Sequence, residues 1–361
     1  MRKKMETREA RRVLFIVKER TVYGTKTKAY GLYNSCDFVA RRLRMNGIEA
    51  KVVQVVDNNC IDREVSQFKP THCFIEAIWV VPSKFEVLAK LHPKVKWNIR
   101  LHSMLPFLAS EGMAFEWLNQ YMELRKKGID ITISCNNDSL YRHMRRLYGK
   151  EVTYTPNVYL PDEECIATEK FDIAKSEDSL HIGCFGALRV LKNHPQQAAW
   201  AIEFADELKR KLHFHINVSE HEQREAGPIL RNLRGIFANT KHVLVEHPWY
   251  NHCDFLELVR KMDIGMQISF TETFNVTAAD FVSCGVPIVV SRDIKFVHPC
   301  CRVDPSDEKG VMSSLRNAID NYIPPFSGGL IFGSCLKCRN KTYLDNHNLK
   351  ATAQWISVLE A

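Results

Sequence analysis

Two successive series of short apolar runs alternate with amphipathic stretches, and this alternation constrains the fold more than any other feature of the sequence. In the first series, strands are predicted at residues 11–18, 49–56, 71–80, 94–102 and 130–136, with helices at 35–47 and 82–92. Helical segments between strands are typical of crossover connections, because neighbouring parallel strands cannot be joined by a tight turn. The first series therefore predicts a parallel sheet covered by helices.

A second series of the same kind follows residues 152–161, which contain two prolines. Here strands are predicted at 179–187, 212–219, 242–249, 264–269 and 287–290, and helices at 194–211, 253–263 and 273–284. A chain of 361 residues is long enough for two domains of about 150 residues, and 45% hydrophobic residues can fill two cores. The sequence therefore predicts an α/β protein with two similar units joined near residue 160.

Membrane and secretory classes are not favoured. No segment approaches the ~18–20 apolar residues of a membrane span, and the charged start MRKKMETREARR lacks the apolar core of a secretory signal. We therefore expect a protein that stays in the cytoplasm where it is made. The 12 cysteines form no regular framework, so we expect reduced thiols. Cys335 and Cys338 have the spacing of a zinc site, but vicinal Cys300 and Cys301 are a poor second pair, and free thiols are favoured over zinc.

The formal net charge is +8, from 50 Lys and Arg against 42 Asp and Glu. Positive charge favours anionic partners such as nucleic acid, nucleotides or a membrane surface. Basic residues are concentrated in the first half of the chain, at 2–4, 11–12, 26–28, 41–44, 125–127 and 142–146. For each cluster alone, a solvated helix face is as good an interpretation as an anion-binding site.

The stretch SFTETFNVTAADFVSCGVPIVVS, residues 269–291, places two acids around one predicted helix. The helix begins at Thr273 or Asn275, and Glu272 precedes it at the carboxyl end of a strand, where ligands of parallel sheets bind. The next acid, Asp280, lies eight residues further on, which is roughly 12 Å along a helix. The two carboxylates are therefore spaced to hold two hydroxyl-bearing parts of one extended ligand such as a nucleotide sugar. A helix cap at Glu272 and a solvent-facing Asp280 are the alternative.

The backbone at the start of this helix is a predicted anion site, because its N–H groups have no partner within the helix and the helix dipole adds positive potential. The residues concerned are Thr273, Phe274, Asn275 and Val276. Phosphates of the extended ligand are expected here.

The segment ETFNVTAADFVSCGVPIVVS resembles the E-x7-E segment of retaining glycosyltransferases of the GT-B fold, often described as glycosyltransferase group 1. It departs from that pattern in its second acid, because Asp280 is one methylene shorter than the usual Glu. FGALRVLKNHP (185–195) is similar to the phosphate-binding loop of this family, and YTPNVYLP (154–161) is similar to its interdomain linker. The resemblance implies two Rossmann-like domains facing each other across a cleft: an acceptor domain at 1–158, a donor domain at 159–335, and a segment at 336–361 whose helix returns toward the first domain.

The resemblance also implies a set of site residues. His102, at the end of a strand, is the catalytic candidate together with Glu272, which is assigned to the hexose. Arg189 and Lys192 are assigned to the diphosphate, and Trp249 or Tyr250 to the base. The full donor-binding set is Gly31, Arg189, Lys192, Trp249, Thr273, Phe274, Asn275, Val276 and Asp280, with no metal ligand. Solvent-exposed charges at Arg189 and Lys192, ordinary packing of Trp249 and a structural His102 are the alternatives.

The implied reaction is sugar transfer with retention of anomeric configuration from a nucleotide sugar, with a UDP-sugar favoured. There is no D-x-D motif, so cationic side chains and the helix dipole are expected to replace a metal, and no tightly bound cofactor is expected. The sequence as a whole is also similar to those of glycosyltransferases encoded by bacteriophages, some of which modify hydroxymethylated DNA bases. We therefore favour a DNA acceptor bound through the basic first domain, in the host cytoplasm if the protein is phage-encoded. Envelope polysaccharide or lipopolysaccharide synthesis, a small-molecule or protein acceptor, and a non-catalytic nucleotide- or DNA-binding relative remain the alternatives.

Overall fold

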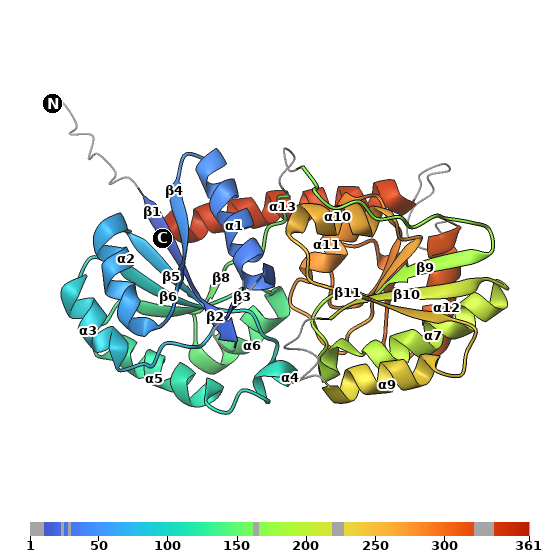
Figure 1. The fold of residues 1–361 in the computed structure, drawn as a ribbon. Coiled ribbons are helices and arrows are strands. Elements are labelled where there is room, and N and C mark those ends of the chain that lie inside the picture. The colour runs from blue at the N-terminus through green and yellow to red at the C-terminus, as the bar shows by residue number, and fades with distance from the viewer. Residues whose placement is uncertain are drawn as a thin grey trace. The chain divides into compact units, whose positions relative to one another are not determined.

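The computed structural model describes residues 11–22, 25–27, 30–161, 166–218, 227–320 and 336–360. The chain divides into two compact units, Met1–Leu160 with Asn348–Ala361, and Pro161–His347. Within the described residues each unit contains one six-stranded sheet (Figure 1). The two units are called unit 1 and unit 2 below, and each is considered by itself.

The sheet of unit 1 is parallel, with strand order β4-β1-β5-β6-β7-β8. Its strands are β1 (Arg12–Lys18), β4 (Glu49–Val55), β5 (His72–Glu76), β6 (Lys96–Leu101), β7 (Ile131–Cys135) and β8 (Thr153–Tyr154). The helices are α1 (Tyr30–Met45), α2 (Ile61–Phe68), α3 (Lys84–Leu91), α4 (Leu105–Leu108), α5 (Ala114–Lys126) and α6 (Asp138–Tyr148), and the last part of α13 (Leu336–Glu360) joins them. A two-stranded antiparallel ribbon, β2 (Arg20–Val22) with β3 (Thr25–Thr27), follows β1. The predicted parallel sheet is confirmed.

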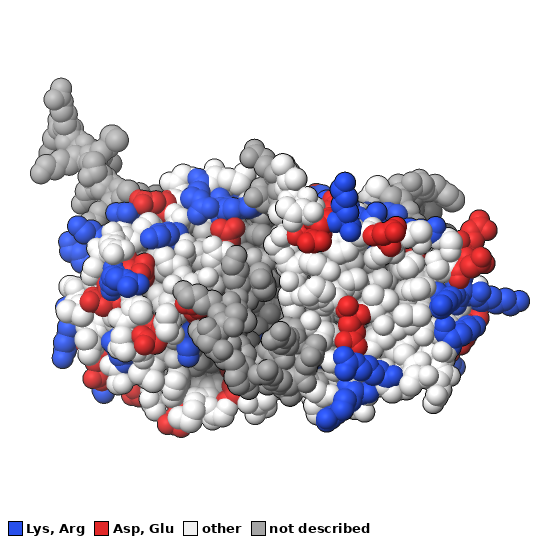
Figure 2. All heavy atoms as spheres, in the orientation of Figure 1, with Lys and Arg blue, Asp and Glu red and all other residues white. Residues whose placement is uncertain are grey.

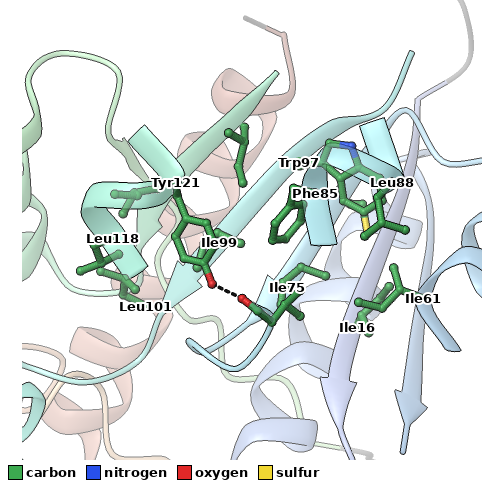
Figure 3. Close-up of a cluster of buried hydrophobic side chains, with 14 of the residues drawn as sticks. Ile16, Ile61, Ile75, Phe85, Leu88, Trp97, Ile99, Leu101, Leu118 and Tyr121 are labelled. Carbon is green, nitrogen blue, oxygen red and sulfur yellow. Dashed lines mark hydrogen bonds between the residues drawn. The ribbon is translucent and has the colours of Figure 1, made fainter. Parts of the chain in front are cut away.

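Alternate residues of β1 enter two separate apolar layers, as expected for a sheet with helices on both faces. Leu14 and Ile16 pack with residues of α2, α3 and α5, including Phe85 and Tyr121, and with Trp97 of β6 (Figure 3). The Tyr121 hydroxyl in this layer donates a hydrogen bond to the carbonyl of Val80.

The other face of the unit 1 sheet is covered by α1 and by the end of α13. Trp355 of α13 packs edge-on against Phe15 and Phe74, with ring centroids 5.6 and 5.0 Å apart. Its indole N–H donates to the carbonyl of Pro156 at 2.7 Å, so the one polar atom of this buried ring has a partner. Residues 336–361, where a helix was expected, contain α13, which spans Leu336–Glu360.

The sheet of unit 2 is also parallel, with strand order β11-β10-β9-β12-β13-β14. Its strands are β9 (Ser179–Gly183), β10 (Lys211–Asn217), β11 (Val243–His247), β12 (Ile264–Gln267), β13 (Ile288–Ser291) and β14 (Arg302–Val303). The helices are α7 (His194–Glu207), α9 (Gly227–Phe237), α10 (His252–Arg260), α11 (Val276–Ser283) and α12 (Glu308–Ile319), with short 3-10 turns η2 (Val190–Lys192) and η3 (Pro299–Cys301).

Two glycines bring α11 close to the unit 2 sheet. A Cβ atom on Gly265 would lie 2.6 Å from the ring of Phe281, and one on Gly183 would lie 2.7 Å from the same ring. Contacts this short do not occur between real atoms, so these strands need glycine where Phe281 of α11 packs on them. The predicted helix carrying Asp280 is thereby fixed against β9 and β12.

Two expectations about cysteines and membranes can be compared with the structure. Cys253 is disulfide-bonded, so the expectation of reduced thiols is wrong at this residue. Spacing along the chain does not reveal which thiols the fold brings within bonding distance. In the described part of the chain no cluster of three or more His, Cys, Asp or Glu side chains is arranged to hold a metal ion, and Cys335 lies outside it. No described helix is both long and apolar enough to cross a membrane.

Candidate functional site

The loops after β9, β10 and β12 leave the same edge of the unit 2 sheet, because the strands are parallel. Gly186, in the loop after β9, has φ +112, a conformation that favours glycine, and its N–H donates to Oδ1 of Asn217 at 3.1 Å. Gln267, at the end of β12, donates to the carbonyl of Phe185 at 2.8 Å. These side-chain bonds tie the three loops together at the carboxyl edge, where the predicted acid cluster lies.

Glu272 is the centre of that cluster and is buried, with 8% of its surface exposed. Its Oε1 accepts hydrogen bonds from the Ser269 hydroxyl at 2.8 Å and the Asn275 amide at 2.9 Å, and it forms an ion pair with Lys192. The backbone N–H of Glu272 donates to Asp293 at 3.2 Å, and burial raises the pKa of Asp293. Within the described residues no hydrogen bond reaches Oε2 of Glu272, so one carboxylate oxygen is held and the other is not.

Asn275 connects this acid to the start of α11. It has the left-handed φ of +68, which Asn tolerates better than most residues, and its Oδ1 accepts from the N–H of Ala278 at 2.8 Å. Its amide nitrogen donates to Glu272 and, at 2.8 Å, to Gln267. Asn275 is therefore the N-cap, and one side chain both begins the helix and orients the carboxylate.

Phe274 and Asp280, two other predicted donor-binding residues, have buried side chains. The Phe274 ring packs against Phe296 and His347, with centroids 4.7 and 5.4 Å apart, so any ligand contact of this residue comes from its backbone. Asp280 is 2% exposed and lies 2.7 Å from Nε2 of His252, the first residue of α10. The alternative of a solvent-facing Asp280 is wrong. No sequence pattern pointed to His252, which lies 28 positions from Asp280.

Arg189 and Lys192 differ in their surroundings, although both were predicted to bind the diphosphate. Arg189 is exposed and extended just before η2, whereas Lys192 is half-buried and ion-paired with Glu272. Trp249 is half-buried and follows β11. Thr273 and Val276 lie on either side of the cap region, half-buried. The structure thus brings Lys192, Glu272 and Asn275 together through side chains and leaves Arg189 at the surface.

Unit 1 contains a second polar cluster, at the carboxyl ends of β5, β6 and β7. Glu76 and Arg100 are opposite each other in the sheet register, are both 0% exposed, and pair at 3.1 Å. His102 follows β6, and its Nε2 is hydrogen-bonded to Oε2 of Glu76. Its Nδ1 lies 3.2 Å from the amide nitrogen of Asn136. The sequence predicted His102 and missed Glu76, Arg100 and Asn136.

Arg100 is held on all sides within unit 1. It donates to the carbonyl of Thr155 at 2.9 and 3.0 Å and to Oδ1 of Asn157 at 2.5 Å, and its guanidinium lies 5.2 Å from the ring of Trp355. Burial alone would raise the pKa of Glu76, but Arg100 and His102 hold it below its usual value. Burial lowers the pKa of His102, although Glu76 acts in the opposite direction.

Gly31 lies in the first turn of α1 and is exposed. Its carbonyl accepts from the Ser35 hydroxyl at 2.9 Å, and Asn157 donates to that hydroxyl at 3.4 Å. A Cβ atom on Gly31 would have no heavy atom within 4 Å, so packing within the described residues does not require glycine here.

Several basic side chains of the clusters predicted in unit 1 pair within the protein, and the cluster at 2–4 lies outside the described residues. Arg44 donates to the carbonyl of Ala50 at 2.8 Å, and Arg125 pairs with Glu151 at 2.5 Å. Further examples are Arg41 with Asp37, Lys126 with Glu123 and Arg142 with Asp138. Figure 2 accordingly shows basic and acidic side chains intermixed on the visible face of unit 1.

Solved structures share this fold over nearly the whole chain. The UDP-forming α,α-trehalose-phosphate synthase from Burkholderia xenovorans, in complex with glucose-6-phosphate, matches with a TM-score of 0.65 and 12% identity, over 97% of this chain and 100% of that one. Anabaena HepE in complex with UDP matches with 0.62 and 11%, over 97% and 99%. The structure named trehalose-6-phosphate from E. coli bound with UDP-2-fluoro glucose matches with 0.60 and 11%, over 96% and 98%.

These structures are GT-B glycosyltransferases, so the predicted α/β fold of GT-B type with two Rossmann-like units is confirmed. No protein-family model matches the sequence, and no curated protein sequence matches it. At 11–12% identity the likeness shows the fold, and the chemistry has to be argued from the residues of this chain.

Proposed function

We propose that the protein is a retaining glycosyltransferase that moves a sugar from a nucleoside diphosphate sugar to a hydroxyl acceptor. The observation that carries the proposal is the cluster of Lys192, Glu272 and Asn275 at the start of α11, in a chain of GT-B fold. A carboxylate with one oxygen held by three donors keeps its second oxygen for a sugar hydroxyl. An ammonium beside it supplies positive charge for a phosphate.

Binding of the leaving nucleoside diphosphate is assigned to Lys192 and to the backbone at the start of α11. Diphosphate gains negative charge as the sugar leaves, and a fixed cation and helix N-terminus stabilise that charge more than they stabilise the intact donor. Arg189, exposed beside η2, is assigned to the same diphosphate. Glu272 is assigned to the hexose and Asp280, with His252, to the nucleotide end of the donor.

A UDP-sugar is the donor we favour. Two of the similar structures are named with UDP or UDP-2-fluoro glucose as bound molecules. Trp249, half-buried after β11, is assigned to the base, on which an aromatic ring can stack.

The proposed reaction uses no metal, because side-chain cations and backbone N–H groups take over the neutralisation of the diphosphate. Addition of EDTA is expected to leave the rate of sugar transfer within about twofold. A strict requirement for magnesium or manganese would contradict this assignment.

The acceptor hypothesis rests mainly on the sequence. Basic clusters in unit 1 suggested hydroxymethylated DNA, and the internal ion pairs of Arg125, Lys126 and Arg142 reduce the charge they offer to a backbone phosphate. Envelope polysaccharide or lipopolysaccharide synthesis is the competing acceptor class, and a non-catalytic nucleotide- or DNA-binding relative is the competing function.

Transfer of radiolabelled sugar tests the proposal directly. UDP-glucose and other labelled nucleotide sugars are incubated with hydroxymethylcytosine DNA, hydroxymethyluracil DNA, unmodified DNA and a lipid-linked acceptor. Label in hydroxymethylated DNA alone supports the DNA acceptor, and label only in the lipid fraction overturns it. If no nucleotide sugar is transferred or hydrolysed although UDP binds, the protein is a binding relative and not an enzyme.

A further inference from the structure

We propose that Glu76 is a positioning residue that fixes His102 in the tautomer with the proton on Nε2, so that Nδ1 accepts a hydrogen bond from a hydroxyl of the sugar substrate. The inference rests on the proposed glycosyltransferase function for the identity of the ligand. The tautomer itself can be tested without any activity.

Glu76 acts through His102 because it cannot reach a ligand itself. The Glu76 side chain is 0% exposed, whereas the His102 side chain is 13% exposed. Glu76 lies at the end of β5 and His102 just after β6, so the buried carboxylate stands behind the imidazole that reaches the surface of unit 1.

The protonation state of Glu76 decides which ring nitrogen carries the proton. Arg100 pairs with the same carboxylate oxygen that His102 contacts, and Thr155 and Asn157 hold Arg100 in place. A carboxylate kept ionised by a buried guanidinium can only accept hydrogen bonds. Nε2 of His102 must therefore be the donor, and in the neutral ring Nδ1 then carries the lone pair.

Asn136 is consistent with this assignment. Its amide nitrogen lies 3.2 Å from Nδ1 of His102, and an NH₂ group can only donate to a ring nitrogen that lacks a proton. Glu76 and Asn136 thus require one and the same neutral tautomer of His102. A sugar hydroxyl can replace the amide as the donor to Nδ1, which makes His102 an acceptor in the site.

The other groups facing this pair do not compete for the proton. From α1, the Cys36 thiol lies beside Glu76, and burial raises its pKa well above the usual value, so it stays neutral. From α13, Trp355 covers Arg100 with an uncharged ring. From β6, Arg100 supplies the only buried positive charge at this end of the described part of the unit 1 sheet.

The first measurement is the tautomer of His102 in the full chain labelled with ¹⁵N-histidine. Long-range ¹⁵N–¹H correlation spectra at pH 7 distinguish the two neutral tautomers and the imidazolium, and His102→Gln identifies the signal. We expect the pattern of a proton on Nε2. A proton on Nδ1, or an imidazolium, would overturn the proposal whether or not the protein proves to be a transferase.

The second measurement compares the pH dependence of kcat/KM between one variant that should lower the pKa of His102 and one that should raise it. Glu76→Gln removes the carboxylate that raises the pKa of His102, so the acid limb of the profile should move to lower pH. Asn136→Asp places a carboxylate beside Nδ1 and favours the imidazolium, so the limb should move to higher pH. Glu123→Gln, which alters an exposed acid paired with Lys126 in the same unit, is the matched control.

We expect kcat of Glu76→Gln to fall by about 100-fold, with a smaller change in the KM of the donor, because misorientation of a reacting group affects the transition state most. If Glu76→Gln does not fold, the wild-type tautomer and Asn136→Asp decide the question. Acid limbs that coincide in wild type and Asn136→Asp would show that the Nδ1 side of His102 has no part in the reaction. If no sugar is transferred at all but the expected tautomer is present, the proposed function fails and the positioning by Glu76 stands.

Discussion

Lys192 and Glu272 form a direct ion pair that joins the turn before α7 to the start of α11 within unit 2. The Glu272 side chain is 8% exposed and that of Lys192 is 26% exposed, so water screens the pair only in part. The cation proposed for the diphosphate and the acid proposed for the hexose are therefore coupled, and neither can be altered without changing the other.

This coupling predicts opposite effects on two ligands in the Glu272→Gln variant. The substitution removes the charge that partly neutralises Lys192, so the affinity for UDP should stay the same or increase. Turnover of the UDP-sugar should fall by about 100-fold, because the sugar loses a fixed acceptor. Calorimetry with UDP and a transfer assay measure the two quantities.

The control for that experiment is Glu257→Gln, an exposed acid paired with Arg260 in α10. Lys192→Ala should weaken UDP binding by about 1.5–3 kcal/mol, the value of a hydrogen bond to a charged group. An equal loss of UDP affinity in Lys192→Ala and Glu272→Gln would contradict the division of roles between these residues.

Asn275 should contribute to both stability and turnover, because its side chain caps α11 and contacts Glu272. Asn275→Ala loses the cap, which costs about 0.5–2 kcal/mol in the free energy of unfolding, and it also places Ala at a φ of +68. Asn275→Gly keeps the backbone conformation and loses the side chain. Chemical denaturation should show Ala less stable than Gly, and turnover should fall in both.

A result in which Asn275→Gly retains wild-type turnover would show that the amide is not needed to orient Glu272. Asp307→Ala is a matched control, since Asp307 caps α12 in the same unit through the N–H of Gly310 and makes no contact with the acid cluster. It should lower stability by a similar amount and leave turnover unchanged.

The fold was predictable because the information lies in local patterns. Buried strands such as β1 and β9 are short apolar runs, and glycine follows several helices, as at Gly47, Gly128 and Gly149. The acid cluster was partly predictable for the same reason, since Glu272 and Asn275 are close in sequence. The contact between Glu272 and Lys192 spans 80 positions, and only the packing of the loops after β9 and β12 creates it.

Glu76 was missed for a specific physical reason. The sequence predicted one strand over 71–80, which places Glu76 in its interior, but β5 ends at Glu76. The strand stops because Ala77 adopts a φ of +71, which is outside the range of strand residues. An alanine in the left-handed region gives no signal in the sequence, so the position of Glu76 at the carboxyl edge of the sheet, beside the predicted His102, could not be located.

Cys300 is expected to be a reactive thiol of unit 2. Its Sγ lies 2.9 Å from Nδ1 of His298, and a hydrogen bond from the Cys301 thiol lowers the pKa of Cys300. Burial raises the pKa of Cys36 and Cys184. The thiolate is the nucleophile, so iodoacetamide at pH 7.5 should label Cys300 well before these two buried cysteines.

Peptide mapping after short labelling times measures the order of modification. Cys301→Ala removes the donor that stabilises the thiolate and should slow labelling of Cys300. Equal labelling rates of Cys300 in wild type and Cys301→Ala would contradict the role of that hydrogen bond.

A row of three histidine side chains in unit 2 should lower the free energy of unfolding of the protein in mildly acidic solution. Nδ1 of His181 lies 3.0 Å from Nε2 of His215, and Nδ1 of His215 lies 2.8 Å from Nε2 of His247. Each contact has room for one proton, so two neighbouring rings of the row cannot both be protonated. Burial, together with the neighbouring histidines, lowers the pKa of His215 to about 2, and burial lowers that of His247 to about 4.

The direction of the pH effect follows from these two values. Above pH 6.5 the rings are neutral in both the folded and the unfolded chain, and they contribute no pH dependence. Below pH 6.5 the unfolded chain takes up protons that the folded chain cannot bind until the pH reaches the lowered pKa of each ring. The free energy of unfolding should therefore decrease by about 1.4 kcal/mol per pH unit for each ring, from pH 6.5 down to about 4 for His247 and further for His215. Urea unfolding of wild type and His215→Gln between pH 7.5 and 4.5 measures this slope. The variant removes one lowered pKa and should lose stability less steeply, and parallel slopes in the two proteins would show that His215 is not the source of the acid sensitivity.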